Sequence, residues 1–114
     1  MRLIQSGPRT SKIVIVGEAP GASEDQTGVT FSGGSGELLN RMLSAVGLSR
    51  SEIFVTNLAH TRPPKNDFNW FLRPKPRPEL LLGVVQLKRD LEEIQPNVIV
   101  ALGSQPLRFL TNKV

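Results

Sequence analysis

The stretch that decides the fold runs from Lys12 to Gly36 and reads KIVIVGEAPGASEDQTGVTFSGGSG. It begins with β-branched apolar residues at 13–16, which is typical of a strand buried on both faces. At Gly17 it enters a loop rich in glycine and carboxylates, and a helix follows directly. α/β proteins build ligand sites at the carboxyl edge of a sheet from such a strand, loop and helix. Neither G-x-G-x-x-G nor the Gly-Lys-Ser/Thr of a P-loop is present, so we expect another chemistry.

The composition bounds the class of protein. The 114 residues suit one domain, and 39% hydrophobic content is ordinary for a globular protein. There is no cysteine and only one histidine, His60, which excludes disulfides, thiolate metal sites and histidine clusters within these residues. No apolar run reaches the roughly 18 residues of a membrane span. We expect a cytoplasmic protein without a metal or an organic cofactor.

The rest of the chain alternates strands with helices. The apolar spacing after Gly36 and the 4, 3, 4, 3 spacing of apolar residues after Pro78 are helical. Ser35 and Ser104 are expected as N-caps, Gly47 as a helix-ending glycine, and residues 49–52 as a turn with a capping box. We predict helices at about 36–46, 78–94 and 105–110, and strands at 13–16, 53–56 and 98–102.

This order predicts an α/β fold in three layers, α/β/α, around a small parallel sheet with right-handed crossovers. Three strands make a small sheet, and a fourth strand is expected in the complete fold. We therefore expect residues 1–114 to form a single domain that is truncated at its C-terminus.

The basic excess is confined to the second half of the chain. Residues 60–114 hold nine basic and five acidic side chains, whereas residues 1–59 hold five of each. The segment 60–77 lacks periodicity and carries four prolines, five Lys/Arg and three aromatic residues. A connection this long is usually functional or disordered. Its charge favours a polyanionic partner or a solvated face, and its aromatic residues are expected to pack the segment onto the domain more than to stack on bases.

Three side chains are expected to share one crevice. Glu18 follows the first strand, Phe31 lies in the loop after it, and Asn57 ends the second strand. Parallel strands bring these positions to the same edge of the sheet. An aromatic face, an amide that offers a donor beside an acceptor, and a carboxylate suit a planar heterocycle. The alternatives are a loop carboxylate, a core ring and an Asx-turn.

Several blocks of residues resemble the uracil-DNA glycosylase superfamily, and the family 4, thermophile-type branch in particular. The first block is Gly17-Glu18-Ala19-Pro20-Gly21 with the spaced residues that follow it up to Leu39. Thr56-Asn57, followed by Arg62-Pro63-Pro64, is similar to the second signature of that branch. The segment 97–103 is similar to its third strand.

The resemblance implies specific roles. Glu18 would activate the water that attacks the sugar C1′, Phe31 would stack on the flipped uracil, and Asn57 would read its edge. The backbone around Ala19, Pro20 and Gly21 would contact the base. The basic residues expected to hold DNA phosphates are Arg62, Lys65, Arg73, Lys75 and Arg77.

The chain also departs from that branch. Family 4 enzymes carry an iron–sulfur cluster on four cysteines, and Thr61 stands where one of them would be expected. The family's last motif, a histidine-bearing loop after a fourth strand, has no counterpart in these residues. The resemblance therefore implies hydrolysis of the N-glycosidic bond of uracil in DNA, in single or double strands, with reduced activity in this chain. The alternatives are a non-catalytic nucleic-acid or base-binding module and a nucleotide-binding protein, and an exposed sheet edge would allow self-association.

Overall fold

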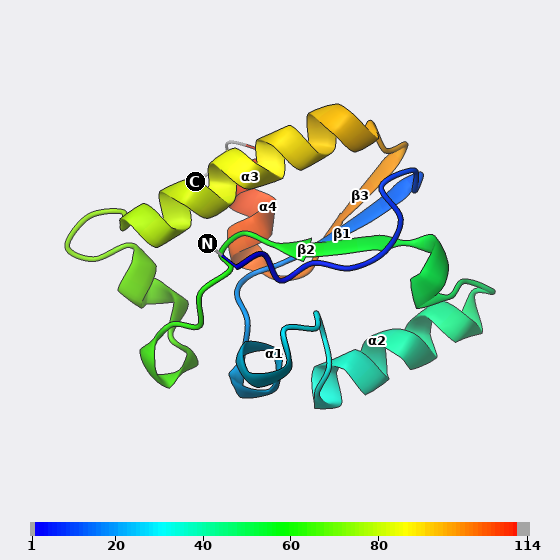
Figure 1. Ribbon diagram of the computed structural model, residues 1–114, viewed down its shortest axis with the longest axis horizontal. Helices are drawn as coiled ribbons and strands as arrows, with labels where there is room; N and C mark the ends of the chain where they lie inside the picture. The colour runs from blue at the N-terminus through cyan, green and yellow to red at the C-terminus, as the bar shows by residue number, and fades with distance from the viewer. Residues whose placement is uncertain (1, 112–114) are drawn as a thin grey trace.

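A computed structural model describes residues 2–111 and shows a three-stranded sheet between helices (Figure 1). The strand order is β2-β1-β3, and both pairs of neighbours are parallel. The predicted α/β fold with a small parallel sheet is thereby confirmed. The elements are β1 (Ile13–Gly17), α1 (Ala22–Thr27), α2 (Gly34–Ala45), β2 (Phe54–Asn57), α3 (Pro78–Ile94), β3 (Val98–Ala101) and α4 (Ser104–Thr111), with short 3₁₀ turns at Arg50–Glu52, Pro64–Asn66 and Phe68–Phe71.

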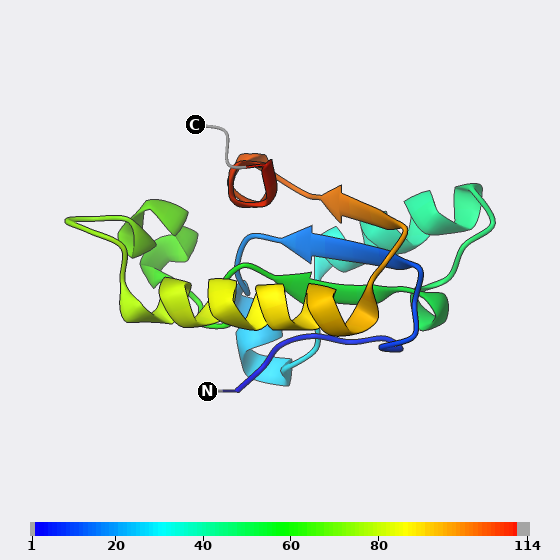
Figure 2. The same ribbon diagram turned by 90° about the horizontal axis from the view of Figure 1, so that it is seen from above.

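The two faces of β1 pack against different helices, as alternation along a strand requires. Val14 and Val16 pack into a cluster with Leu80 and Leu87 of α3. Ile15, on the opposite face, packs into a second cluster with leucines of α2. Figure 1 shows α3 above the sheet and α2 below it. In Figure 2 the strand arrowheads point toward α4 and toward the segment between β2 and α3, so the loops after the strands gather there.

The helix ends confirm some predictions and correct others. Gly47 ends α2 as predicted: its φ of +79° is left-handed, and Leu48 N–H bonds to Leu43 O in the manner of a Schellman motif. Ser35 is not the N-cap of α2, because the helix begins at Gly34 after Gly33. Ser49 does not form a capping box, since its hydroxyl bonds to side chains and not to a backbone N–H.

The N-terminal residues belong to the core, which their sequence does not indicate. Ile4 is completely buried, and Ser6 exchanges two backbone hydrogen bonds with Val55 in an isolated antiparallel bridge. This bridge covers the outer edge of β2.

Strand β3, in contrast, carries an exposed apolar row: Val98, Ile99 and Val100 are 51%, 42% and 36% exposed. Among residues 2–111, no helix is long and apolar enough to span a membrane.

The segment between β2 and α3 is folded onto the domain. Phe68 and Phe71 are buried in the α3 cluster with their ring centroids 5.2 Å apart. Gly83 permits the close approach of α3, because a methyl group there would lie 2.0 Å from Leu58 O. The expectation that these aromatic residues pack the segment onto the domain is therefore confirmed.

Candidate base-binding site

Phe31 and Asn57 meet at the last residue of β1. Asn57 is paired with Gly17 in the sheet register, so the ends of β1 and β2 lie side by side. A methyl group on Gly17 would lie 2.5 Å from Asn57 Oδ1 and 2.9 Å from Phe31 Cζ. Both side chains thus lie against the bare Cα of Gly17. Together with Ala19, Glu24 and Ser35 they line a cavity of about 60 Å³.

Asn57 is only 4% exposed, and no hydrogen bond of its side chain is found within residues 2–111, but its amide atoms are not fully enclosed, since the residue lines the cavity. An Asx-turn would have satisfied this amide, and none is formed. The side chain therefore presents an unused donor and acceptor to the cavity that it lines.

Glu18 lies at the same edge of the sheet but points toward α4. Its Oε2 accepts a hydrogen bond of 3.3 Å from Gln105 N–H in the first turn of α4. A methyl group on Gly103 would lie 2.7 Å from the same oxygen. With Ala19, Pro20 and Gly21, Glu18 lines a second cavity of about 80 Å³, whose other wall is formed by Pro63, Asn66 and Phe68. Ala19 lines both cavities, so the three expected side chains lie around one residue but not in one cavity.

Glu24 holds the glycine-rich loop in shape. Its carboxylate accepts backbone N–H bonds from Gly21, Ser32 and Gly33 at 2.9, 3.0 and 3.2 Å. Although burial raises it, these bonds keep the pKa of Glu24 below its usual range. The short helix α1, which the sequence did not predict, carries this residue. These contacts give Glu24 a structural role in the loop.

His60 is a structural residue rather than part of the cavities. It is 5% exposed, and its Nδ1 accepts a hydrogen bond of 2.9 Å from Ile4 N–H, so the neutral ring carries its proton on Nε2. Burial lowers the pKa of His60 in spite of nearby Asp90. The hydrogen bond from Ile4 also disfavours the charged ring, because Nδ1 could no longer accept from the Ile4 N–H once it carried a proton.

Stability is expected to fall as the pH drops below about 6.5, the ordinary histidine value. The lowered pKa of His60 in the folded state means that the unfolded chain binds the proton more readily, so acidification favours unfolding. Urea unfolding at pH 7.5 and pH 5.5 measures this dependence. His60→Asn keeps an acceptor near Nδ1 without titrating and should flatten the difference. A wild-type stability that rises toward pH 5.5 would contradict the assignment.

The five basic residues between β2 and α3 differ in their exposure and in whether their charged groups contact other residues. Lys65, Arg73 and Lys75 are exposed. Arg62 donates to Asn66 Oδ1. Arg77 is tied to Trp70, since its guanidinium carbon lies 4.1 Å from the ring centroid and its Nε donates to Trp70 O. Exposed charge is therefore concentrated on three of the five.

The residues do not fit an iron–sulfur cluster. Such clusters need thiolate ligands, and residues 1–114 contain no cysteine. Thr61 is exposed and lies beside the buried His60. No group of three or more His, Cys, Asp or Glu side chains within residues 2–111 could hold a metal ion.

Ser35, which lines a cavity, and Gly17, which lies behind it, were not anticipated as part of the site. Ser35 was expected as a helix cap and instead lines the cavity beside Asn57. The sequence indicates no role for Gly17 in the site beyond its place in the first motif, although the lack of a side chain at Gly17 is what admits Phe31 and Asn57. A glycine that ends a buried strand is a weak signal of close approach, and Ser35 gave none.

The fold and the cavities define an α/β protein with a candidate ligand site at the carboxyl edge of a parallel sheet. The family model described as "Uracil DNA glycosylase superfamily" matches residues 4–113. The chain therefore belongs to the uracil DNA glycosylase superfamily.

Curated relatives place it near one branch. It is 42% identical to a type-4 uracil-DNA glycosylase of Archaeoglobus fulgidus over 93% of this chain and 50% of that protein. It is 38% identical to the type-4 enzyme of Saccharolobus solfataricus over 95% of this chain and 48% of that protein. For the type-4 enzyme of Thermotoga maritima the identity is 36%, over 96% and 54%. The chain spans about half the length of the curated relatives it matches.

Proposed function

We propose that this chain carries the base pocket and the catalytic carboxylate of a glycosylase that removes uracil from DNA. The observation that carries the proposal is the side chain of Asn57, which makes no hydrogen bond within residues 2–111, lines a cavity and lies with Phe31 against Gly17. The names of the relatives, all type-4 uracil-DNA glycosylases, supply the substrate class.

Recognition follows from the donor and acceptor pattern of the base. Uracil presents an N–H donor beside a carbonyl acceptor, which match Oδ1 and Nδ2 of Asn57. Cytosine presents an acceptor beside an amine donor, so with the amide held in the same orientation each group would meet its like and remain unpaired. Each unpaired group costs roughly 1–3 kcal/mol, which supports discrimination. A cavity of about 60 Å³ is small, so a base stacked on Phe31 would lie across Ala19 into the cavity beside Glu18.

The reaction is a hydrolysis. A water oxygen forms a bond to C1′ of the sugar, the C1′–N1 bond breaks, and its electron pair leaves with uracil. Glu18 accepts the proton of the water or stabilises the positive charge that develops on the sugar. The cavity that Glu18 lines lies next to the one lined by Phe31 and Asn57, with Ala19 common to both. This arrangement supports attack by water from the side of Glu18.

The proposal is tested with three oligonucleotides that differ in one base: uracil, cytosine or thymine. Single-turnover reactions are treated with alkali to cut abasic sites and are resolved by electrophoresis. Excision of uracil alone is expected. The proposal fails if uracil is not released, or if cytosine is released at the same rate.

A non-catalytic base-binding module is the second candidate, and one observation favours it. Glu18 Oε2 is bonded to Gln105 N–H and lies against Gly103, away from the cavity of Asn57. A carboxylate committed to the first turn of α4 could serve structure only. Binding of uracil-containing DNA that depends on Asn57, without any abasic product, would establish this alternative.

The DNA partner is proposed to contact the exposed basic residues between β2 and α3. Replacing Lys65, Arg73 and Lys75 by glutamine should weaken binding to all DNA sequences. The log–log salt dependence should fall by about 0.9 for each lost contact to a duplex phosphate. Fluorescence anisotropy at several salt concentrations measures both effects. A triple variant of exposed residues elsewhere, R41Q/K88Q/R89Q, changes the charge equally and should keep the slope. Equal slopes for the two triple variants would contradict this proposal.

The preference for single-stranded or duplex DNA is measured with the same anisotropy assay.

Self-association is a further proposal, which the exposed apolar row on β3 supports. Sedimentation at rising protein concentrations tests it, and a mass that stays that of one chain would contradict it.

A further inference from the structure

The backbone of Phe31 is held in an unusual conformation. Its φ is +49°, in the left-handed region that residues with a side chain rarely adopt. Such conformations persist where the surroundings determine them, and they gather at ligand sites. The ring of Phe31 lies against Gly17 and beside Asn57. What fixes this backbone therefore also fixes the face that the ring offers to a base.

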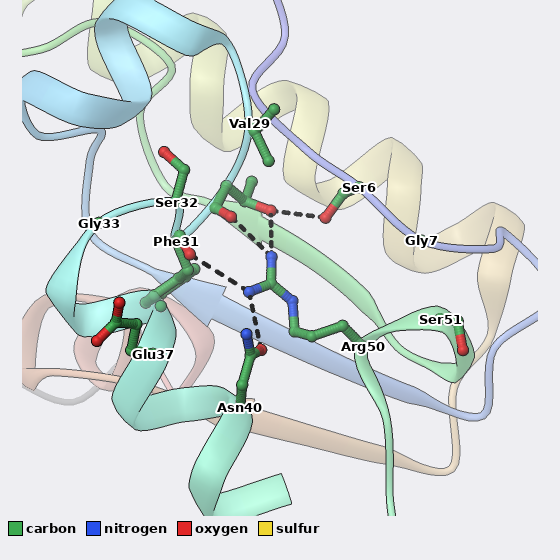
Figure 3. A pocket seen from close by; sticks show the side chains of 12 residues that line it. Ser6, Gly7, Val29, Phe31, Ser32, Gly33, Glu37, Asn40, Arg50 and Ser51 are labelled. Atoms are coloured by element: carbon green, nitrogen blue, oxygen red, sulfur yellow. Dashed lines mark hydrogen bonds between the residues drawn. The ribbon is translucent and has the colours of Figure 1, made fainter.

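Arg50 bonds to the two carbonyl groups on either side of this strained position. It lies in the 3₁₀ turn before β2, and its Nη2 donates to Thr30 O at 2.7 Å and to Thr30 Oγ1 at 3.1 Å. Its Nη1 donates to Phe31 O at 3.4 Å. Figure 3 shows these hydrogen bonds in the wall of a pocket of about 470 Å³, which Arg50 lines together with Thr30 and Phe31. Thr30 is itself fully buried, and its hydroxyl bonds to Ser6.

The charged guanidinium of Arg50 donates hydrogen bonds only to neutral groups within residues 2–111. Within residues 2–111 the structure gives it no ion pair, and its other hydrogen bond goes to Asn40 Oδ1. Burial lowers the pKa of Arg50, and its buried Nε has no partner. Burying a cation costs free energy, and here no ion pair offsets that cost, because Arg50 bonds only to carbonyl, hydroxyl and amide oxygens. Charge balance alone therefore does not explain its position. Its contacts concentrate on Thr30 and Phe31.

The other side of Phe31 is fixed independently. Glu24 accepts the N–H groups of Ser32 and Gly33. Gly36 closes the loop, since a methyl group there would lie only 1.5 Å from Phe31 O. Two charged groups thus hold Phe31: the carboxylate of Glu24 through the two residues that follow it, and the guanidinium of Arg50 through the carbonyl groups of Thr30 and Phe31. Removing the guanidinium leaves only one of the two restraints.

We propose that Arg50 is a positioning residue for Phe31, fixing the ring at the angle required for stacking on a flipped base. The proposal rests on the proposed function, because the ring must serve a base for its angle to matter there. Arg50 touches no base and acts only through the Thr30–Phe31 backbone. It lines the pocket of about 470 Å³ with Phe31 and is not among the residues that line the cavity of Asn57.

A double-mutant cycle tests this chain of action. Arg50→Met is expected to lower kcat/KM for uracil excision about tenfold, within the range of a lost base-stacking contact. Arg50→Lys should recover part of this loss, because an amine can still donate to one carbonyl. In a Phe31→Ala background Arg50→Met should have no further effect. Arg41→Met, an exposed change of equal charge, is the matched control. A full tenfold loss in both backgrounds would overturn the proposal.

A second measurement does not depend on activity. Incorporation of 4-fluorophenylalanine gives one fluorine NMR line for each of the five phenylalanines, and Phe31→Leu assigns the line of Phe31. Arg50→Met should move or broaden that line and leave the other four in place. An unchanged Phe31 line, or equal loss of all five native lines, would overturn the proposal. If the wild-type chain releases no uracil, the proposed function fails, while the fluorine line still decides the role of Arg50.

Discussion

Replacing Glu18 by glutamine is expected to stop uracil excision while the fold and the binding of the base are kept. Glutamine has the same shape and keeps an oxygen that can accept the hydrogen bond from Gln105 N–H. It cannot take a proton from water or balance positive charge on the sugar. Loss of a general base lowers rates by roughly 10²–10⁴-fold. Single-turnover excision measures the rate, and anisotropy with uracil-containing DNA measures binding.

The control for this substitution is Glu92→Gln, which makes the same chemical change on the exposed face of α3. It should leave both rate and binding unchanged. Wild-type excision by E18Q would show that another group activates the water. Loss of binding together with activity would show that the contact of Glu18 with α4 is structural.

Gly17→Ala is expected to destroy base recognition without unfolding the sheet. The added methyl group would lie 2.5 Å from Asn57 Oδ1 and 2.9 Å from Phe31 Cζ, so both side chains must move. The backbone of Gly17 is not left-handed, and alanine can adopt it. Losing one stacking contact and one hydrogen bond together costs roughly 3–4 kcal/mol, which corresponds to about 10²–10³-fold in affinity or rate.

The matched control is Gly34, the first residue of α2. A methyl group on Gly34 would meet nothing within 4 Å, so Gly34→Ala should keep recognition and slightly favour α2. Circular dichroism of both variants verifies the fold. If Gly17→Ala bound uracil-containing DNA as tightly as Gly34→Ala, the meeting of Phe31 and Asn57 at Gly17 would not be the site of recognition.

The sequence predicted the elements well because local patterns determine them. Four β-branched residues, a proline at a first helical turn and a regular 4, 3, 4, 3 spacing leave few alternatives, and β1 and α3 lie where predicted. It also predicted the edge of the sheet where Glu18 and Asn57 lie, since both directly follow or end parallel strands, whereas the place of Phe31 depends on the shape of the loop.

The remaining features depend on contacts between distant residues. The side chain of Glu18 is drawn to Gln105, and His60 is fixed by Ile4; neither pairing has a local signature. Arg50 sits in a short polar turn that reads as solvent-exposed, yet it reaches the backbone of Phe31 nineteen positions earlier. Such contacts follow only after the loop has its shape, so no spacing rule reveals them.

The central place of β1 in the sheet also sets the order in which the protein can fold. Val14 pairs with Phe54 on one side and with Ile99 on the other. During synthesis the first strand is therefore made long before either neighbour, and its second edge stays open until all of α3 and then β3 have followed. Parallel pairings between such distant segments carry a large loop-closure cost and form slowly. The apolar run at 13–16, which gives the fold its centre, is consequently also the segment that a nascent chain must protect the longest from aggregation.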